Sequence, residues 1–104
     1  VIRGSDLLDN TERQIWLGQC LNYPKLQYMH LPLAMNAHGS KLSKQNHAEA
    51  LNIQHAPQTL AQALSALGQP PADIDQPYKM LTQAISQWDR KLIPKGTEMN
   101  GIYQ

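Results

Sequence analysis

An apolar run that is broken by a proline and followed by a turn most constrains how this chain can fold. Residues 29–35 are mostly apolar, but Pro32 has no N–H to donate to a β-ladder. The run is therefore predicted to lie at a sheet edge or at a strand end. Residues 36–39, with the sequence Asn-Ala-His-Gly, have the composition of a turn, in which Gly39 can adopt a positive φ.

The segment after this turn carries two lysines, Lys41 and Lys44, with the small hydroxyl donor Ser43 between them. Two ammonium groups and a hydroxyl on a loop suit a polyanion such as a triphosphate. A Lys-x-x-Lys pattern by itself more often marks an exposed basic turn, because lysines are common in solvated loops. The flanking residues therefore decide how this loop is interpreted.

Those flanking residues resemble a known family. The string KLSK at residues 41–44, after HLPL at residues 30–33 and a glycine-containing turn, resembles the KMSKS-type loop of class I aminoacyl-tRNA synthetases, and most of all their glutamyl branch. The continuation QNHA at residues 45–48 resembles the members of this branch that act on queuosine in tRNA(Asp). Residues 1–8 and 11–15 match as well, and the resemblance fades after about residue 50.

This resemblance implies an enzyme that activates glutamate with ATP and Mg²⁺ as glutamyl-adenylate. The glutamyl group would then pass to queuosine in the anticodon of tRNA(Asp). Lys44 corresponds to the lysine that contacts ATP and stabilises the charge on the departing pyrophosphate, assisted by Lys41 and Ser43. Arg3 corresponds to an arginine that binds glutamate. The resemblance implies no cofactor beyond the nucleotide and its magnesium.

Arg3 is also notable for its position in the sequence. It follows two β-branched residues and precedes Gly4, which predicts the end of a buried strand. Active-site residues of open α/β sheets collect at such strand ends, and a guanidinium can donate two hydrogen bonds to one carboxylate. The residues alone favour an ordinary ion pair with Asp6 or Asp9, whereas the resemblance favours glutamate.

Two alternatives use the same residues. One is an ordinary glutamyl-tRNA synthetase, although that enzyme usually has an arginine where this chain has Gln45, and a large anticodon-binding region beyond the catalytic part. The other is a non-catalytic helical module whose basic loop binds an RNA backbone or a protein. This second alternative does not account for the combined matches around Arg3, Thr11 and Lys41.

Composition limits the remaining classes of function. One cysteine, Cys20, excludes an internal disulfide and a cysteine-based zinc cage and fits a reducing compartment, so we predict a cytoplasmic protein. No segment has the roughly 18 apolar residues of a membrane span, so we expect no membrane partner. A net charge of +1 means that any RNA contact must be local. The four histidines lack the partners and spacing of a metal site, and none is predicted at His30, His38, His47 or His55.

Three helices are predicted. Residues 11–14 fit a capping box for a helix that ends near residue 22, with an apolar face that packs on the sheet and consists of Trp16, Leu17, Cys20 and Leu21. A second helix begins after Gln54 and ends at Gly68. A third helix, capped by Asp75, is expected to pack on the second through Leu81, Ala84, Ile85 and Trp88.

We therefore predict an α/β fold in three parts. Residues 1–50 form the end of a Rossmann-like catalytic domain with the KLSK loop, residues 51–92 form a small helical bundle, and residues 93–104 form an irregular tail. The chain opens on strand-like residues and lacks the HIGH signature of this class, so we expect the C-terminal part of a longer enzyme, inactive on its own. An open strand edge favours self-association of the isolated piece.

Overall fold

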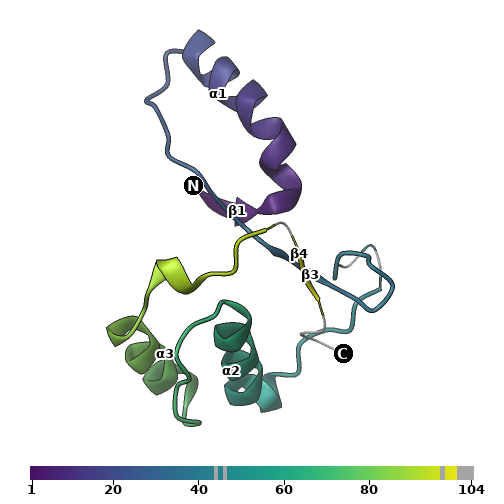
Figure 1. The fold of residues 1–104 in the computed structure, drawn as a ribbon, viewed down its shortest axis with the longest axis vertical. Coiled ribbons are helices and arrows are strands. Elements are labelled where there is room, and N and C mark those ends of the chain that lie inside the picture. The colour runs from purple at the N-terminus through teal and green to yellow at the C-terminus, as the bar shows by residue number, and fades with distance from the viewer. Residues whose placement is uncertain (44, 46, 97, 101–104) are drawn as a thin grey trace.

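The computed structural model describes residues 1–43, 45, 47–96 and 98–100, the last three by their backbone alone. Helix α1 (Thr11–Cys20) lies at one end of the molecule, and α2 (Ala56–Ala66) and α3 (Pro77–Ser86) lie at the other (Figure 1). Short strands lie between these two helical parts. The predicted mixture of helices and strands is confirmed.

The first part of the chain is a strand, helix, strand unit. Strand β1 (Ile2–Gly4) leads through the 3₁₀-helix η1 (Ser5–Asn10) and α1 to β2 (Met29–Leu31), which pairs with β1 in parallel. Such a parallel pair needs a crossover connection, which α1 supplies here. The strand predicted at the start of the chain is confirmed, but its predicted burial is wrong, because Ile2 is 69% exposed.

Strand β3 (Leu33–Met35) follows β2 directly, with the buried Pro32 between them. The predicted interruption at Pro32 is therefore confirmed. Strand β3 pairs in parallel with β4 (Glu98–Asn100). An irregular tail was predicted over residues 93–104, and β4 corrects that prediction within residues 98–100. These three residues lack the alternating pattern typical of a strand, but pairing with β3 holds their backbone extended.

Helix α1 begins at Thr11 as predicted, but its capping box is wrong. The N-cap residue is Asn10, no side chain caps the helix, and the Thr11 hydroxyl donates instead to the Leu7 carbonyl oxygen over 3.2 Å. The helix also buries none of its residues. The apolar face predicted to pack on the sheet is open, with Trp16 66% exposed. A pair of three-residue strands, each about 10 Å long, is too small to cover a helix of about 15 Å.

Helices α2 and α3 enclose the main core. Met80 is fully buried, and it packs with the buried side chains of Leu64, Ala72 and Ala84. The predicted packing of these two helices on each other is confirmed. The face of α3 differs from the prediction, because Met80 and Ala84 lie inside while Leu81, Ile85 and Trp88 are exposed.

The start of α3 also differs from the prediction by one position. Gln76 is the N-cap residue, and the Asp75 carboxylate accepts a hydrogen bond from the Gln76 N–H over 2.7 Å. Pro77 occupies the first turn, where its missing N–H costs nothing. The helix is therefore started by backbone geometry and proline rather than by the Asp75 side chain.

Gly68 ends α2 as predicted, and it does so in a Schellman motif. The Gly68 N–H donates to Ser65 and the Gln69 N–H donates to Leu64, with Gly68 at a φ of +67°. The next side chain, Gln69, is buried, donates to the Asp89 carbonyl oxygen and accepts from the Asp89 N–H. The end of α2 is thereby tied to the segment that follows α3.

Substituting Gly68 with alanine should destabilise the protein by about 2–4 kcal/mol. An added Cβ would cost about 1–2 kcal/mol at this φ and would also overlap the Leu92 carbonyl oxygen. Gly39→Ala is the matched control, because Gly39 has a φ of +76° but no other described part of the chain comes within 4 Å of the place that its Cβ would take. Denaturant unfolding should show the larger loss for Gly68→Ala, and equal losses would mean that the Leu92 contact imposes no constraint.

Candidate functional site

The Arg3 side chain lies at the centre of a polar cluster between β1, β2 and α1. Its Nε donates to His30 Nε2 over 3.1 Å, and its Nη2 donates to Thr11 Oγ1 over 2.9 Å. A longer contact of 3.4 Å joins Nη2 to the Leu7 carbonyl oxygen. Arg3 and His30 are direct partners in the parallel register of β1 and β2, which explains why they meet.

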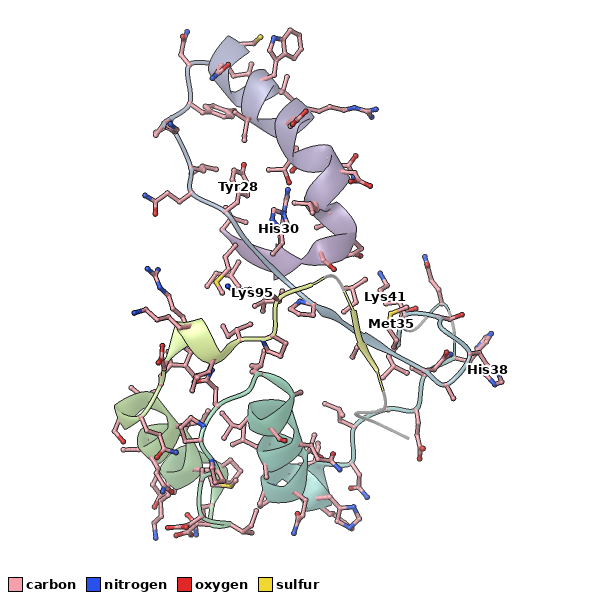
Figure 2. The ribbon with its side chains drawn as sticks, in the orientation of Figure 1. Tyr28, His30, Met35, His38, Lys41 and Lys95 are labelled. Atoms are coloured by element: carbon pink, nitrogen blue, oxygen red, sulfur yellow. The ribbon has the colours of Figure 1, made fainter. Side chains whose placement is uncertain are left out.

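Tyr28 forms one wall of the same cluster. The Arg3 guanidinium carbon lies 5.0 Å from the centroid of the Tyr28 ring, which is within the range of a cation–π contact. The Tyr28 and His30 rings are nearly parallel, at 9°, with their centroids 6.1 Å apart. Tyr28 and His30 occupy the space between their own strand segment and α1 (Figure 2). Arg3 is therefore held by hydrogen bonds of its Nε and Nη2 atoms and by the contact with the Tyr28 ring.

The turn after β3 forms as the sequence predicted. The Asn36 side-chain oxygen accepts from the N–H groups of His38 and Ser40, each over 2.9 Å, and Gly39 has a positive φ. The chain then returns beside β3, where Lys41 forms an antiparallel bridge with Met35. His38 projects from the turn, away from the Arg3 cluster (Figure 2). The start of the lysine loop, which is the KLSK segment of residues 41–44, is thus fixed by its own backbone.

Lys41 connects this loop to η1. Its Nζ lies 2.9 Å from Asp6 Oδ2, and this hydrogen bond lowers the pKa of the Asp6 carboxyl group. Both groups are partly solvated, so the pair contributes little to stability. The same η1 segment supplies the Leu7 carbonyl oxygen that accepts from Arg3. Lys41 and Arg3 are therefore brought together in one region by η1, the segment between β1 and α1.

The remaining loop residues are placed less completely. Ser43 is half-buried, and its carbonyl oxygen accepts from the Ala48 N–H over 3.1 Å. Lys44, which the resemblance assigns to ATP, lies outside the described residues. Its role and that of Ser43 stay predictions.

The ion pair that the residues alone favoured for Arg3 is not formed in the described part of the chain. Asp6 pairs with Lys41, and the contacts of Arg3 are with Thr11, Leu7 and His30. Because none of these contacts is a carboxylate, the charge of the guanidinium is not compensated by an ion pair among the described residues. Such an arginine can form charge-assisted hydrogen bonds with an external anion.

Sequence reasoning missed the residues that hold Arg3, namely Thr11, Tyr28 and His30. Thr11 was interpreted as a helix cap, and His30 was considered as a metal ligand and was not predicted to be one. The available signal was topological: a helix between two short strands predicts a parallel pair, and a parallel pair sets Arg3 and His30 beside each other.

Neither a cluster of metal-ligating side chains nor a membrane-spanning helix occurs among the described residues. Within residues 1–43, 45, 47–96 and 98–100, no three histidine, cysteine or acidic side chains are grouped as a metal site would need. No helix in the same residues is sufficiently long and apolar to span a membrane.

Comparisons with known proteins point to one family. The family model described as tRNA synthetases class I (E and Q), catalytic domain, matches residues 1–92. A Glutamyl-Q tRNA(Asp) synthetase of Acinetobacter baylyi is 58% identical over 103 residues, which are 99% of this chain and 35% of that protein.

Proteins of the same name from other organisms are also similar. The one from Neisseria meningitidis serogroup A is 46% identical over 96 residues, covering 91% of this chain and 32% of that protein. The one from Photobacterium profundum is 43% identical over 102 residues, covering 95% and 33%. The chain spans about a third of the length of the curated relatives it matches.

Proposed function

The chain belongs to the family of class I tRNA synthetase catalytic domains for E and Q, and we propose that it acts within an enzyme that attaches glutamate to queuosine in tRNA(Asp). In this proposal ATP activates the glutamate carboxylate as glutamyl-adenylate, with release of pyrophosphate. A hydroxyl of the cyclopentenediol of queuosine then accepts the glutamyl group as an ester, and AMP leaves. We also propose that the β1–α1–β2 unit is the end of a Rossmann-like sheet.

The observation that carries this proposal is the match over 99% of the chain to a relative named Glutamyl-Q tRNA(Asp) synthetase. The geometry agrees with a role in binding an amino-acid carboxylate, because Arg3 lies one residue before the end of β1 and none of its contacts, with His30, Thr11 and the Leu7 carbonyl oxygen, is a carboxylate. The loop that carries Lys41 begins beside the same η1 segment.

The proposed roles of the residues follow from their chemistry. Arg3 binds a glutamate carboxylate through charge-assisted hydrogen bonds. Lys44 stabilises the negative charge that builds up on the pyrophosphate as it leaves, and Lys41 and Ser43 support the loop that carries it. Magnesium enters bound to the phosphates of ATP, as is usual for this ion.

Mass spectrometry of tRNA tests the proposed function. The full-length protein is incubated with ATP, glutamate and queuosine-containing tRNA(Asp), and the nucleosides are analysed after digestion. We expect one glutamyl group on queuosine and none on tRNA(Asp) that lacks queuosine. Glutamate at the 3′ end of tRNA(Glu) would instead identify an ordinary glutamyl-tRNA synthetase, and the absence of any transfer would favour a binding module.

A further inference from the structure

We propose that His30 is a positioning residue, which as a neutral imidazole fixes the Arg3 guanidinium for the carboxylate of the substrate. This inference rests on the proposed function for its substrate, and on the contacts of the described residues for its geometry. It goes beyond the family resemblance, which assigns glutamate to Arg3 and gives no role to His30.

The hydrogen bond between the two side chains requires one form of the imidazole. Arg3 Nε carries a hydrogen and donates it, so His30 Nε2 must accept with its lone pair. The hydrogen of a neutral His30 is therefore on Nδ1. The Thr11 hydroxyl lies 3.1 Å from the same Nε2, and its single hydrogen can be donated either to this nitrogen or to the Leu7 carbonyl oxygen, 3.2 Å away.

These contacts determine which part of Arg3 can bind a ligand. Nε is held by His30, and Nη2 is held by Thr11 and more weakly by Leu7. Among the described residues, none forms a hydrogen bond with Nη1 of Arg3. A carboxylate can therefore approach Nη1, and it can use the second hydrogen of Nη2 by displacing the 3.4 Å contact to Leu7.

The aromatic contacts also restrict the orientation of the Arg3 guanidinium. The centroid of the Tyr28 ring lies 5.0 Å from the guanidinium carbon, and this ring is stacked against the His30 ring. The hydrogen bonds of Nε and Nη2, together with the contact with the Tyr28 ring, leave the guanidinium few orientations. An arginine fixed before the substrate arrives loses less side-chain entropy on binding, which improves affinity.

Protonation of His30 would reverse its effect on Arg3. An imidazolium has no lone pair on Nε2, so it cannot accept from Arg3 Nε, and it places a second positive charge beside the guanidinium. Of the described groups in contact with the ring, Arg3 on β1 is the charged one, Tyr28 next to β2 is also titratable, and Thr11 on α1 is neutral. None of these contacts offers a carboxylate that would compensate an imidazolium.

Three substitutions of His30 that differ in the reach of the side chain test the proposal. Glutamine carries its side-chain oxygen about where imidazole carries Nε2, so it can still accept from Arg3, whereas the shorter asparagine reaches only to the position of Nδ1. We expect His30→Asn and His30→Ala to raise the glutamate KM about 2- to 10-fold with little change in kcat. His30→Gln should restore most of the loss. His55→Gln is the control, because His55 is exposed on the 3₁₀-helix η3 (Ile53–His55).

The pH profile separates positioning from a merely structural role. Only an imidazole with a free lone pair on Nε2 can accept from Arg3, so the glutamate KM of the unmodified enzyme should rise as the pH falls from about 8 to 5.5. This rise should be absent in His30→Gln and retained in His55→Gln. Equal KM values and equal pH profiles for His30→Gln, His30→Asn and the unmodified enzyme would overturn the proposal.

A measurement without substrate keeps the proposal testable if the variants fold poorly. The ¹⁵N chemical shifts of the imidazole in the full-length protein report which ring nitrogen carries the hydrogen. We expect His30 in the Nδ1–H form at pH of about 8, and an Nε2–H form would overturn the geometry. If glutamate-dependent activity is absent while His30 is in the Nδ1–H form, the proposed substrate fails and the Arg3–His30 contact stands.

Discussion

Replacing Arg3 with alanine in the full-length enzyme should raise the glutamate KM about 10- to 150-fold. The substitution removes charge-assisted hydrogen bonds to a carboxylate, which typically contribute about 1.5–3 kcal/mol. The substrate carboxylate would then lie beside His30 and Thr11, which carry no compensating charge. Steady-state pyrophosphate exchange, with glutamate varied at saturating ATP, measures the effect.

Two further variants make this result specific. Arg3→Lys keeps the charge but cannot donate to His30 and Thr11 from one planar group, so we expect only a small recovery. Arg13→Ala is the matched control, because Arg13 is exposed on α1. A glutamate KM and a rate that are unchanged in Arg3→Ala would mean that Arg3 has a structural role only.

The parts of the fold that could be predicted from the sequence are those set by neighbouring residues. Pro32 interrupts the extended run because it has no N–H, and Gly39 and Gly68 adopt the positive φ values that their turns need. The start of α1 at Thr11 and the end of α2 at Gly68 follow from the same local rules. Each of these features depends on a few consecutive residues.

The parts that could not be predicted depend on residues distant in the sequence. The exposure of Trp16 on α1 follows from how little sheet the described strands provide, which periodicity cannot reveal. On α3 Met80 is fully buried whereas Ile85 is 75% exposed, because α2 approaches from the side of Met80. Strand β4 exists because β3 pairs with it.

The candidate site shows the same division. Arg3 and the lysine loop were identified from the resemblance, which depends on short consecutive strings. Thr11, Tyr28 and His30 were missed because none of them is a neighbour of Arg3 in the sequence. The pairing of β1 with β2 brings Tyr28 and His30 to Arg3, and the start of α1 brings Thr11 there. Thr11 is instructive, because its hydroxyl, expected to cap α1, accepts from Arg3 instead.

The ion pair between Lys41 and Asp6 bears on the role of Lys41 in the loop. Lys41 Nζ already has a carboxylate at 2.9 Å, so part of its charge is compensated before any phosphate arrives. A triphosphate would have to compete with Asp6 for this ammonium group. We therefore expect Lys41 to anchor the start of the loop and to contribute less to catalysis than Lys44.

Replacing Lys44 with alanine should slow adenylate formation about 10²- to 10³-fold, which is the loss expected for one preorganised electrostatic group. Ground-state ATP binding should weaken much less. The reason is that charge builds up on the pyrophosphate only as its bond to the α-phosphate breaks, and an interaction that strengthens on the way to the transition state affects the rate. Single-turnover adenylate formation and equilibrium ATP binding, both on the full-length enzyme, measure the two quantities separately.

The comparison with Lys41→Ala decides whether this loop has the proposed role. Because Lys41 is paired with Asp6, its loss should cost clearly less in rate than the loss of Lys44. Lys91→Ala, at an exposed lysine on the 3₁₀-helix η4 (Arg90–Leu92), controls for the removal of one positive charge. Equal and small losses for Lys41→Ala and Lys44→Ala would show that the loop is a solvated basic turn, because neither lysine would then stabilise the transition state.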